Sequence, residues 1–230
     1  MVAAFGAAQS ERAARPLFTF YDDASGERTE VSAATLGNWV AKTANLLVDG
    51  LGLGPGEVAR VGLPPHWQTA AVLLGCWSAG LVVDLGADPR PAAVAFVTPD
   101  AAVAPGLAAE DVLVLALAPM AAPVRPGPPT GTVDFVVEVR RHGDHFQPTR
   151  MPPATPALAD GTTHGALVEA ARAAGLPTTG RVMIDGDVAT DPAVWLVAPL
   201  LAGTSVVLCR HTDPARREAR LATERATAYP

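Results

Sequence analysis

The amino-acid sequence predicts an α/β fold with mostly parallel sheets and flanking helices. Apolar segments typical of buried strands, at 58–63 and 81–85, enclose a helical segment at 66–79. A strand, a helix and a strand within about 30 residues indicate a βαβ unit with parallel strands. With 230 residues, 49% of them hydrophobic, the chain is long enough to bury a core without disulfide or metal staples.

The N-terminal part predicts a β-hairpin followed by a helix. Segments Leu17–Tyr21 and Glu30–Ser32 flank the turn-rich letters D-D-A-S-G-E-R-T, an arrangement typical of two antiparallel strands. Ser32 is a good N-cap, and apolar residues recur at spacings of three and four from residue 33 onward. This helix is expected to end at Gly50 or Gly52, because glycine readily takes the left-handed conformation found at helix ends.

The central region is less clearly organised. A strand is predicted at 112–117, whereas 133–140 fits either a strand or a helix. Prolines concentrate at 119–129 and at 148–156, and the second stretch is the better boundary. We therefore expect a first α/β lobe at 1–150, which ends in a Pro-rich connector, and a second, truncated βα lobe at 151–230.

After that boundary the pattern becomes clear again, with helices and strands in alternation. We expect helices at 163–174, 192–201 and 213–223, and strands at 181–184 and 204–208.

Composition excludes several classes of function. The net charge of -6 argues against a nucleic-acid-binding surface, which would be basic. The apolar stretches at 70–83 and 194–209 are shorter than the ~20 residues of a membrane-spanning helix, and no signal-peptide pattern precedes them. Cys76 and Cys209 lie in apolar runs typical of buried reduced thiols. These features predict a cytoplasmic protein that contacts neither nucleic acid nor membrane.

The glycines of Gly52-Leu-Gly54-Pro-Gly56 resemble a nucleotide loop only superficially. A dinucleotide fingerprint lies between a strand and the following helix, so that the helix N-terminus faces the phosphates. Here the glycines follow a helix and precede a strand. They are expected to form a structural turn.

Three stretches of the chain resemble the N-terminal part of the adenylate-forming, AMP-binding and acyl-CoA synthetase-like superfamily. They are G-L-G-P-G-E-V-A-R-V, the letters Thr163-His164-Gly165-Ala166-Leu167, and the segment from Arg181 to Cys209. The resemblance covers about residues 17–85 and 160–210, and it is greatest to short actinobacterial proteins with weak similarity to AMP-binding enzymes. It implies a fold and a lineage.

The family's phosphate loop is the feature that the chain matches least. In one alignment, Gly161-Thr162-Thr163 is that loop; in the other, Thr163-His164-x-x-Leu167 opens the following helix and the loop is deleted. Spacing favours deletion, because no room remains for the family's Pro-Lys-Gly ending. The alternative leaves a weak anion site made by Gly161, Thr162, Thr163 and His164, the only cofactor-binding candidates.

Other hallmarks of the family are also missing. The single lysine, Lys42, lies far from the loop, and Asp185-Gly186-Asp187-Val188 stands where the family carries Pro-Leu-x-His. The sequence stops at Pro230, before the family's Tyr-Gly-x-Thr-Glu motif, its ribose-binding aspartate and its lid with a catalytic lysine. No catalytic residue is therefore assigned.

Three further groups could carry chemistry, and each has a structural alternative. Asp185 and Asp187 form either a divalent-metal pair or a solvated turn. His142-Gly-Asp144-His145 contains residue types that bind metal ions but lacks a third or fourth ligand at suitable spacing. His66 and Trp67 begin the second helix and either face a ligand cleft, as the resemblance implies, or cap and pack. No metal site is expected.

Three hypotheses of function follow. The first is a non-catalytic adenylate-forming homologue that acts as a binding or interaction protein, with a protein partner or a small acyl or nucleotide ligand. The alternative is an acyl- or aminoacyl-adenylating, AMP-binding ligase subunit completed by a partner chain. The third is an orphan domain retained for assembly. No cofactor is expected; AMP and ATP are the nucleotides to test.

Overall fold

The computed structural model describes residues 2–86 and 90–229, which form two compact units. Unit 1 comprises Met1–Leu36, Pro64–Ala70 and Ala166–Pro230, and unit 2 comprises Gly37–Leu63 and Ala71–Gly165. The units are thus interleaved along the chain, whereas a single division near residue 150 is predicted from the sequence. The physical reason is strand pairing, because an N-terminal hairpin joins C-terminal strands in one sheet.

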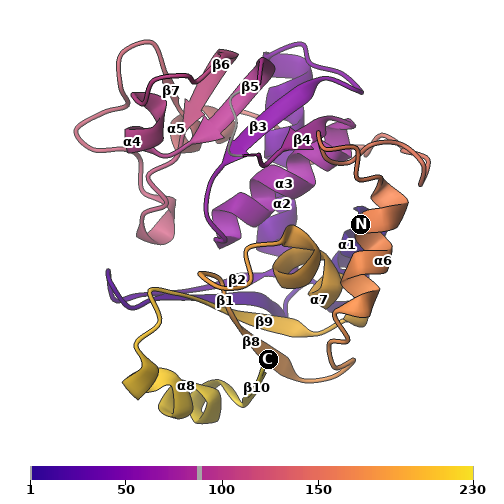
Figure 1. The fold of residues 1–230 in the computed structure, drawn as a ribbon, viewed down its shortest axis with the longest axis vertical. Coiled ribbons are helices and arrows are strands. Elements are labelled where there is room, and N and C mark those ends of the chain that lie inside the picture. The colour runs from indigo at the N-terminus through magenta and orange to yellow at the C-terminus, as the bar shows by residue number, and fades with distance from the viewer. Residues whose placement is uncertain (1, 87–89, 230) are drawn as a thin grey trace. The chain divides into compact units, whose positions relative to one another are not determined.

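The sheet of unit 1 has the strand order β10-β8-β9-β1-β2 (Figure 1). Its strands are β1 (Pro16–Asp22), β2 (Glu27–Ser32), β8 (Arg181–Asp185), β9 (Ser205–Arg210) and β10 (Ala226–Ala228). β1 and β2 form the predicted antiparallel hairpin, and the other neighbours pair in parallel.

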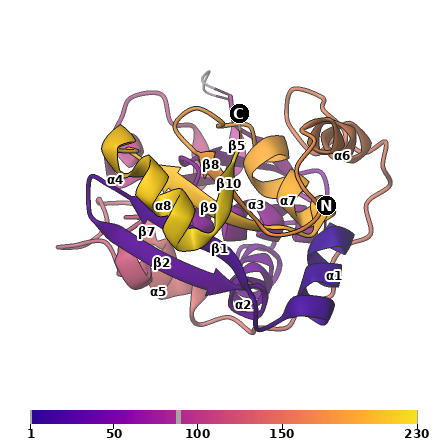
Figure 2. The same cartoon turned by 90° about the horizontal axis from the view of Figure 1, so that it is seen from below.

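Helices cover both faces of this sheet. On one face lie the helical turn η3 (Ala193–Val197) and α7 (Ala198–Ala202), and the ring of Trp195 meets that of Phe18 edge-on at 6.4 Å. On the other lies α8 (Arg217–Glu224), whose Leu221 packs against Met183, Val207 and Cys209 (Figures 1 and 2). Because β9 side chains alternate between the two covered faces, the four central residues of this strand are all buried.

Ion pairs attach α8 to its face of the sheet. The buried Glu224 carboxylate accepts hydrogen bonds from the guanidinium groups of Arg28 and Arg181 and from the Tyr21 hydroxyl, the last at 2.6 Å. One turn earlier, the Arg220 guanidinium donates to Asp23 at 2.5 Å. α8 is therefore held by buried charges as well as by Leu221.

The sheet of unit 2 is entirely parallel, with the order β4-β3-β5-β6-β7. Its strands are β3 (Val58–Gly62), β4 (Val82–Asp84), β5 (Ala92–Val97), β6 (Ala109–Val114) and β7 (Val133–Asp134). β3 and β4 pair in parallel around α3 (Trp67–Ala79), which confirms the predicted βαβ unit.

Two of the longest helices pack closely within unit 2. In α2 (Ala33–Asn45), continued by the turn η1 (Leu46–Gly50), Thr43 lies against Gly75 of α3. A Cβ placed on Gly75 would lie 2.6 Å from the Thr43 Cγ2 atom, so this contact requires a residue without a side chain. Phe135 adds an aromatic cluster, with its ring 5.7 Å from that of Phe96.

The remaining elements are short. They are α1 (Val2–Arg12), α4 (Pro99–Ala102), η2 (Pro119–Ala121), α5 (Phe135–Val139), α6 (His164–Ala173) and η4 (Pro214–Arg216). The ambiguous segment at 133–140 is both a strand, β7, and a helix, α5, in succession. Both cysteines are free and buried, as predicted. Across residues 2–86 and 90–229, no helix is long and apolar enough to cross a membrane.

Candidate functional site

A short segment, 157–159, extends the sheet of unit 2 beside β4. Leu158 forms a parallel bridge with Val83, whose amide donates to the Ala157 carbonyl at 3.0 Å. The Trp77 indole N–H donates to the same carbonyl at 3.1 Å. Residues 160–163 then lead directly into α6, which begins at His164. This is the strand–loop–helix order in which backbone amides at a helix N-terminus can face an anion.

The amides of this loop are nevertheless occupied by acceptors of the chain itself. The N–H groups donate as follows: Gly161 to the Leu158 carbonyl at 3.1 Å, Thr162 to the Asp160 carboxylate at 2.8 Å, His164 to the Thr155 carbonyl at 3.0 Å, and Gly165 to the Pro153 carbonyl at 2.8 Å. An anion would have to displace these acceptors before the loop could bind it.

Asp160 places a negative charge within the loop. Hydrogen bonds from the backbone and side chain of Thr162 lower the pKa of the Asp160 carboxyl, with a smaller contribution from the positive charge of Arg90, so Asp160 is ionised at neutral pH. Its carboxylate therefore accepts the Thr162 amide hydrogen bond that a phosphate oxygen would otherwise accept. A Ser/Thr/Gly-rich phosphate loop, which the resemblance implies at this place, carries no such charge.

A hollow of about 260 Å³ lies at the carboxyl ends of β4 and of the 157–159 segment. This is the edge at which parallel α/β sheets usually bind ligands. Two carboxylates line it, those of Asp84 and Asp160. Asp84 is buried and paired with the Arg60 guanidinium at 2.9 Å, while Arg90 donates to the Ala159 carbonyl at 3.1 Å.

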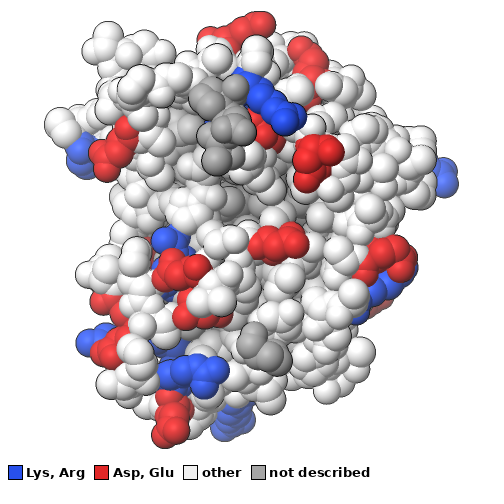
Figure 3. All heavy atoms as spheres, in the orientation of Figure 1, with Lys and Arg blue, Asp and Glu red and all other residues white. Residues whose placement is uncertain are grey.

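The face of the molecule drawn in Figure 3 shows acidic and basic side chains interspersed among neutral ones. No extended basic area appears on that face. Among the described residues, the charges at the site are those of the two carboxylates, Arg60 and Arg90.

His164 is the one loop residue whose side chain bears an unsatisfied buried atom. Its Nε2 is buried and makes no hydrogen bond to a residue within 2–86 or 90–229. Burial lowers the pKa of the ring, so His164 is neutral at pH 7 and adds no positive charge to the loop. The structure thus brings Gly161, Thr162, Thr163 and His164 together, but as a tightly bonded turn.

His66 is a core residue at the start of α3. Its Nδ1 accepts a hydrogen bond from the Gln68 amide at 3.0 Å, and its ring meets that of Phe20 at 4.2 Å. Burial, aided by the positive charge of Arg210, lowers the pKa of His66 to about 3. These contacts favour the capping and packing interpretation over a ligand-facing one.

The acidic segment after β8 forms a bonded turn. The Asp187 carboxylate accepts hydrogen bonds from the Arg210 guanidinium and from the His211 amide at 2.5 Å, while Asp185 accepts from the Asp187 amide at 3.0 Å. Both aspartates therefore have partners within the chain. This arrangement favours the turn interpretation over the metal pair.

The His142–His145 segment is likewise a bonded loop. The Lys42 ammonium donates to the His142 carbonyl, and the Asn45 amide donates to the carbonyls of Gly143 and His145. Within the part of the chain that the structure describes, no group of three or more His, Cys, Asp or Glu side chains could hold a metal ion.

Known proteins resemble this chain in sequence and in fold. No family model matches the sequence. A protein of Mycobacterium tuberculosis (strain ATCC 25618 / H37Rv), the "TIGR03089 family protein", is 43% identical over 223 residues, which cover 92% of this chain and 90% of the relative. The chain belongs to the TIGR03089 family.

Solved structures show where this fold is found. A Brucella canis acyl-CoA synthetase superposes with a TM-score of 0.70 at 17% identity, over 93% of this chain and 44% of the synthetase. The anthranilate CoA ligase AuaEII, solved with anthranoyl-AMP, gives a TM-score of 0.65 at 15% identity, over 96% of this chain and 46% of the ligase. The predicted fold is confirmed. The chain spans less than half the length of either enzyme.

Two parts of the site were not predicted from the sequence. Asp160-Gly161-Thr162 has the letters of a turn in which an aspartate bonds the amide two residues on, and this signal could have revealed the blocked amide. No sequence pattern predicted the pairing of 157–159 with β4, because the segment is short and follows a Pro-rich stretch.

Proposed function

We propose that this chain is a non-catalytic homologue of the adenylate-forming enzymes and acts as a binding or interaction protein in the cytoplasm. One observation carries the proposal. At the loop where the family resemblance implies a phosphate site, the backbone amides donate to the chain's own carbonyls and to the Asp160 carboxylate. The bonded amides of Gly161, Thr162, His164 and Gly165 are not free to bind a triphosphate.

The charges near the loop support the same conclusion. Phosphoryl and adenylyl transfer depend on positioning and on stabilisation of the developing charge, usually by lysine, arginine or a metal ion. Lys42 is the only lysine, and its ammonium donates to the His142 carbonyl. Arg60 is paired with Asp84, which leaves Arg90 as the one cation lining the hollow, opposite the carboxylates of Asp84 and Asp160.

Size also limits what the hollow can hold. Pockets for drug-sized ligands have volumes of about 300–1,000 Å³, and the hollow measures about 260 Å³. The part of the hollow lined by described residues is thus below this range. A small ligand, or a side chain of a protein partner, fits it better.

Isothermal titration with ATP and with AMP, each with and without Mg²⁺, tests the proposal. We expect no Mg²⁺-dependent ATP binding in the micromolar range. AMP binding that ATP does not exceed would support a nucleoside pocket without phosphate chemistry. Micromolar, Mg²⁺-dependent ATP binding would refute the proposal and support the ligase subunit instead.

A matched pair of variants separates the loop from the overall charge. Asp160→Asn removes the loop's carboxylate, whereas Glu110→Gln removes one exposed carboxylate on β6. If Asp160 repels anions, D160N alone should strengthen any weak phosphate binding, by a few-fold for a single screened charge. Equal effects of both variants would show that only net charge matters.

A further inference from the structure

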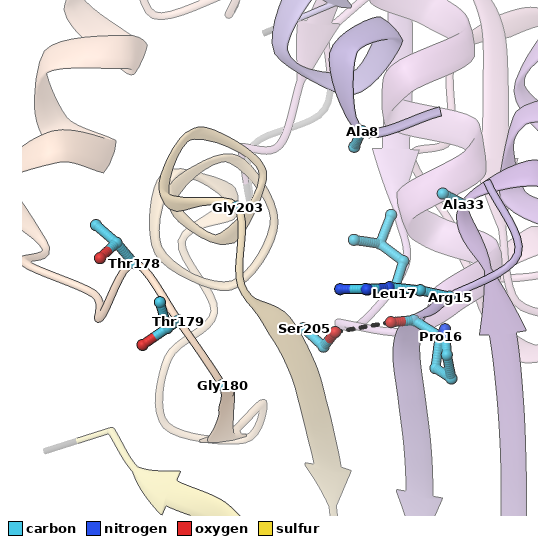
Figure 4. A pocket seen from close by; sticks show the side chains of 10 residues that line it. All are labelled: Ala8, Arg15, Pro16, Leu17, Ala33, Thr178, Thr179, Gly180, Gly203 and Ser205. Carbon is cyan, nitrogen blue, oxygen red and sulfur yellow. Dashed lines mark hydrogen bonds between the residues drawn. The ribbon is translucent and has the colours of Figure 1, made fainter. Parts of the chain in front are cut away.

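A second pocket lies within unit 1, at the opposite end of the parallel strands from the usual ligand edge. Its volume is about 240 Å³, and it opens where β1, β8 and β9 begin (Figure 4). These three strands are neighbours in the sheet and run in parallel, so their amino ends meet at one edge. The feature is independent of the loop at 160–163, which belongs to unit 2.

Among the described side chains that line this pocket, that of Arg15 carries the only charge. Its guanidinium extends along one wall, and the pocket contains no aspartate or glutamate in a chain whose net charge is -6 (Figure 4). Within residues 2–86 and 90–229, no side chain forms a hydrogen bond or ion pair with this guanidinium. The N–H donors of the Arg15 guanidinium therefore face the pocket and have no acceptor among the described side chains.

The opposite wall carries two hydroxyl groups. Thr178 and Thr179 lie on the loop before β8, and neither side chain bonds to another residue of the described chain (Figure 4). Their loop is nevertheless fixed in place, because the Gly180 carbonyl accepts the Thr204 hydroxyl at 2.9 Å and the Ser205 amide at 3.3 Å. The backbone of this wall is thus anchored beside the pocket.

The wall that carries Arg15 is anchored as well. The Arg15 carbonyl accepts a hydrogen bond from the Ala33 amide at 3.3 Å, and the neighbouring Pro16 carbonyl accepts one from the Ser205 hydroxyl at 2.7 Å. The second bond joins β9 to β1 across the floor of the pocket (Figure 4). The distance between the backbones of the two walls is therefore set by strand pairing, while the exposed Arg15 side chain still loses rotamer freedom on binding.

The end of α7 is the one feature that opposes an anion here, because carbonyl groups point out of a helix C-terminus. This helix directly continues η3, and the combined helical segment, Ala193–Ala202, stops at Gly203, which takes the left-handed conformation with φ +74°. Its Pro199 carbonyl already accepts the amides of Gly203 and Thr204, at 2.9 and 3.1 Å. The opposing field is thus weak beside the full charge of Arg15.

We propose that this pocket binds a small oxyanion, a carboxylate or a phosphate group, through the Arg15 guanidinium, with the loop of Thr178 and Thr179 as the opposite wall. The planar guanidinium fork matches two oxygens of either group. Leu17 and Ala33 provide an apolar side to the pocket, against which a short hydrocarbon portion of an organic anion packs.

NMR titration of the whole chain tests this proposal, with inorganic phosphate, acetate and butyrate as separate probes at constant ionic strength. We expect saturable shifts at the amides of Gly180 and Ser205. Arg15→Gln should weaken the binding by about tenfold or more, the typical loss for hydrogen bonds to a charged group. Arg217→Gln, at an exposed arginine of α8, should leave it unchanged.

The outcomes separate the two sources of the anion. Tighter binding of phosphate assigns a phosphate group, and tighter binding of butyrate than of acetate or phosphate assigns an organic carboxylate. Arg15→Lys, which keeps the charge but loses the fork, should give an intermediate affinity. Shifts that do not saturate with any probe, or equal affinity of the wild type and R15Q, would overturn the proposal.

Discussion

Glu224 offers the sharpest test of how unit 1 holds α8 on its sheet. Its side chain is 4% exposed and accepts hydrogen bonds from Arg28, Arg181 and Tyr21. Glu224→Gln keeps the size of the side chain but removes its charge. The two guanidinium groups then lose their buried shared counter-ion and keep only the more exposed one, Glu30, at 3.3 and 3.5 Å.

The magnitude follows from the exposure of the partners. Breaking a buried ion pair costs about 3–5 kcal/mol, and an exposed pair contributes about 0–1 kcal/mol. The carboxylate is buried, but the Arg28 side chain is 46% exposed and that of Arg181 is 22% exposed. We therefore expect E224Q to lose about 2–3 kcal/mol of unfolding free energy.

The effect should depend on pH in a defined direction. Burial alone would raise the pKa of Glu224, but hydrogen bonds from Tyr21 and Arg28, together with the charges of Arg28 and Arg181, lower it overall. A carboxyl with a lowered pKa stabilises the fold above its unfolded value, which is 4.5 for glutamate, and this stabilisation is lost as pH falls through the folded pKa. The difference between wild type and E224Q should therefore shrink below that value.

Urea unfolding followed by circular dichroism, repeated from neutral to acidic pH, measures both quantities. Glu218→Gln is the matched control, since this exposed glutamate lies on the same helix, and its effect should stay within about 0.5 kcal/mol. A loss below about 1 kcal/mol for E224Q, or a loss that does not change with pH, would refute the reasoning.

Further predictions concern packing. Gly75→Ala should destabilise the fold by about 1–3 kcal/mol, because the added Cβ would lie 2.6 Å from the Thr43 Cγ2 atom. Gly6→Ala in α1, where no heavy atom lies within 4 Å, should instead stabilise it by up to about 1 kcal/mol; opposite signs in urea unfolding confirm both. Trp77→Phe removes the indole N–H that donates to the Ala157 carbonyl and should cost about 1–2 kcal/mol, with faster amide exchange at Ala157; unchanged exchange there would contradict the anchoring role.

The elements most readily predicted were those with strong periodicity and clear punctuation. The hairpin β1–β2 and the unit β3-α3-β4 have alternating or continuous apolar patterns, closed by glycine or proline. β5, at Ala92–Val97, was missed although it is buried and flanked by Pro91 and Pro99, which are turn signals.

The site was harder to predict than the fold, because its key contacts join distant segments. The letters Asp160-Gly161-Thr162 indicate that an aspartate caps the loop. They do not indicate that the His164 amide donates to the Thr155 carbonyl. Arg15 and Thr179 lie far apart in sequence, and only the pairing of β1, β9 and β8 brings them to one pocket. Local pattern cannot show such a juxtaposition.

Amide hydrogen exchange, read residue by residue with NMR, tests the central claim most directly. The account predicts that the amides of Gly161, Thr162, His164 and Gly165 exchange slowly in the free protein, and that adding Mg²⁺ and ATP changes neither their exchange rates nor their chemical shifts. Rapid exchange in the free protein, followed by protection and saturable shifts on adding ATP, would show an open phosphate loop and contradict the account.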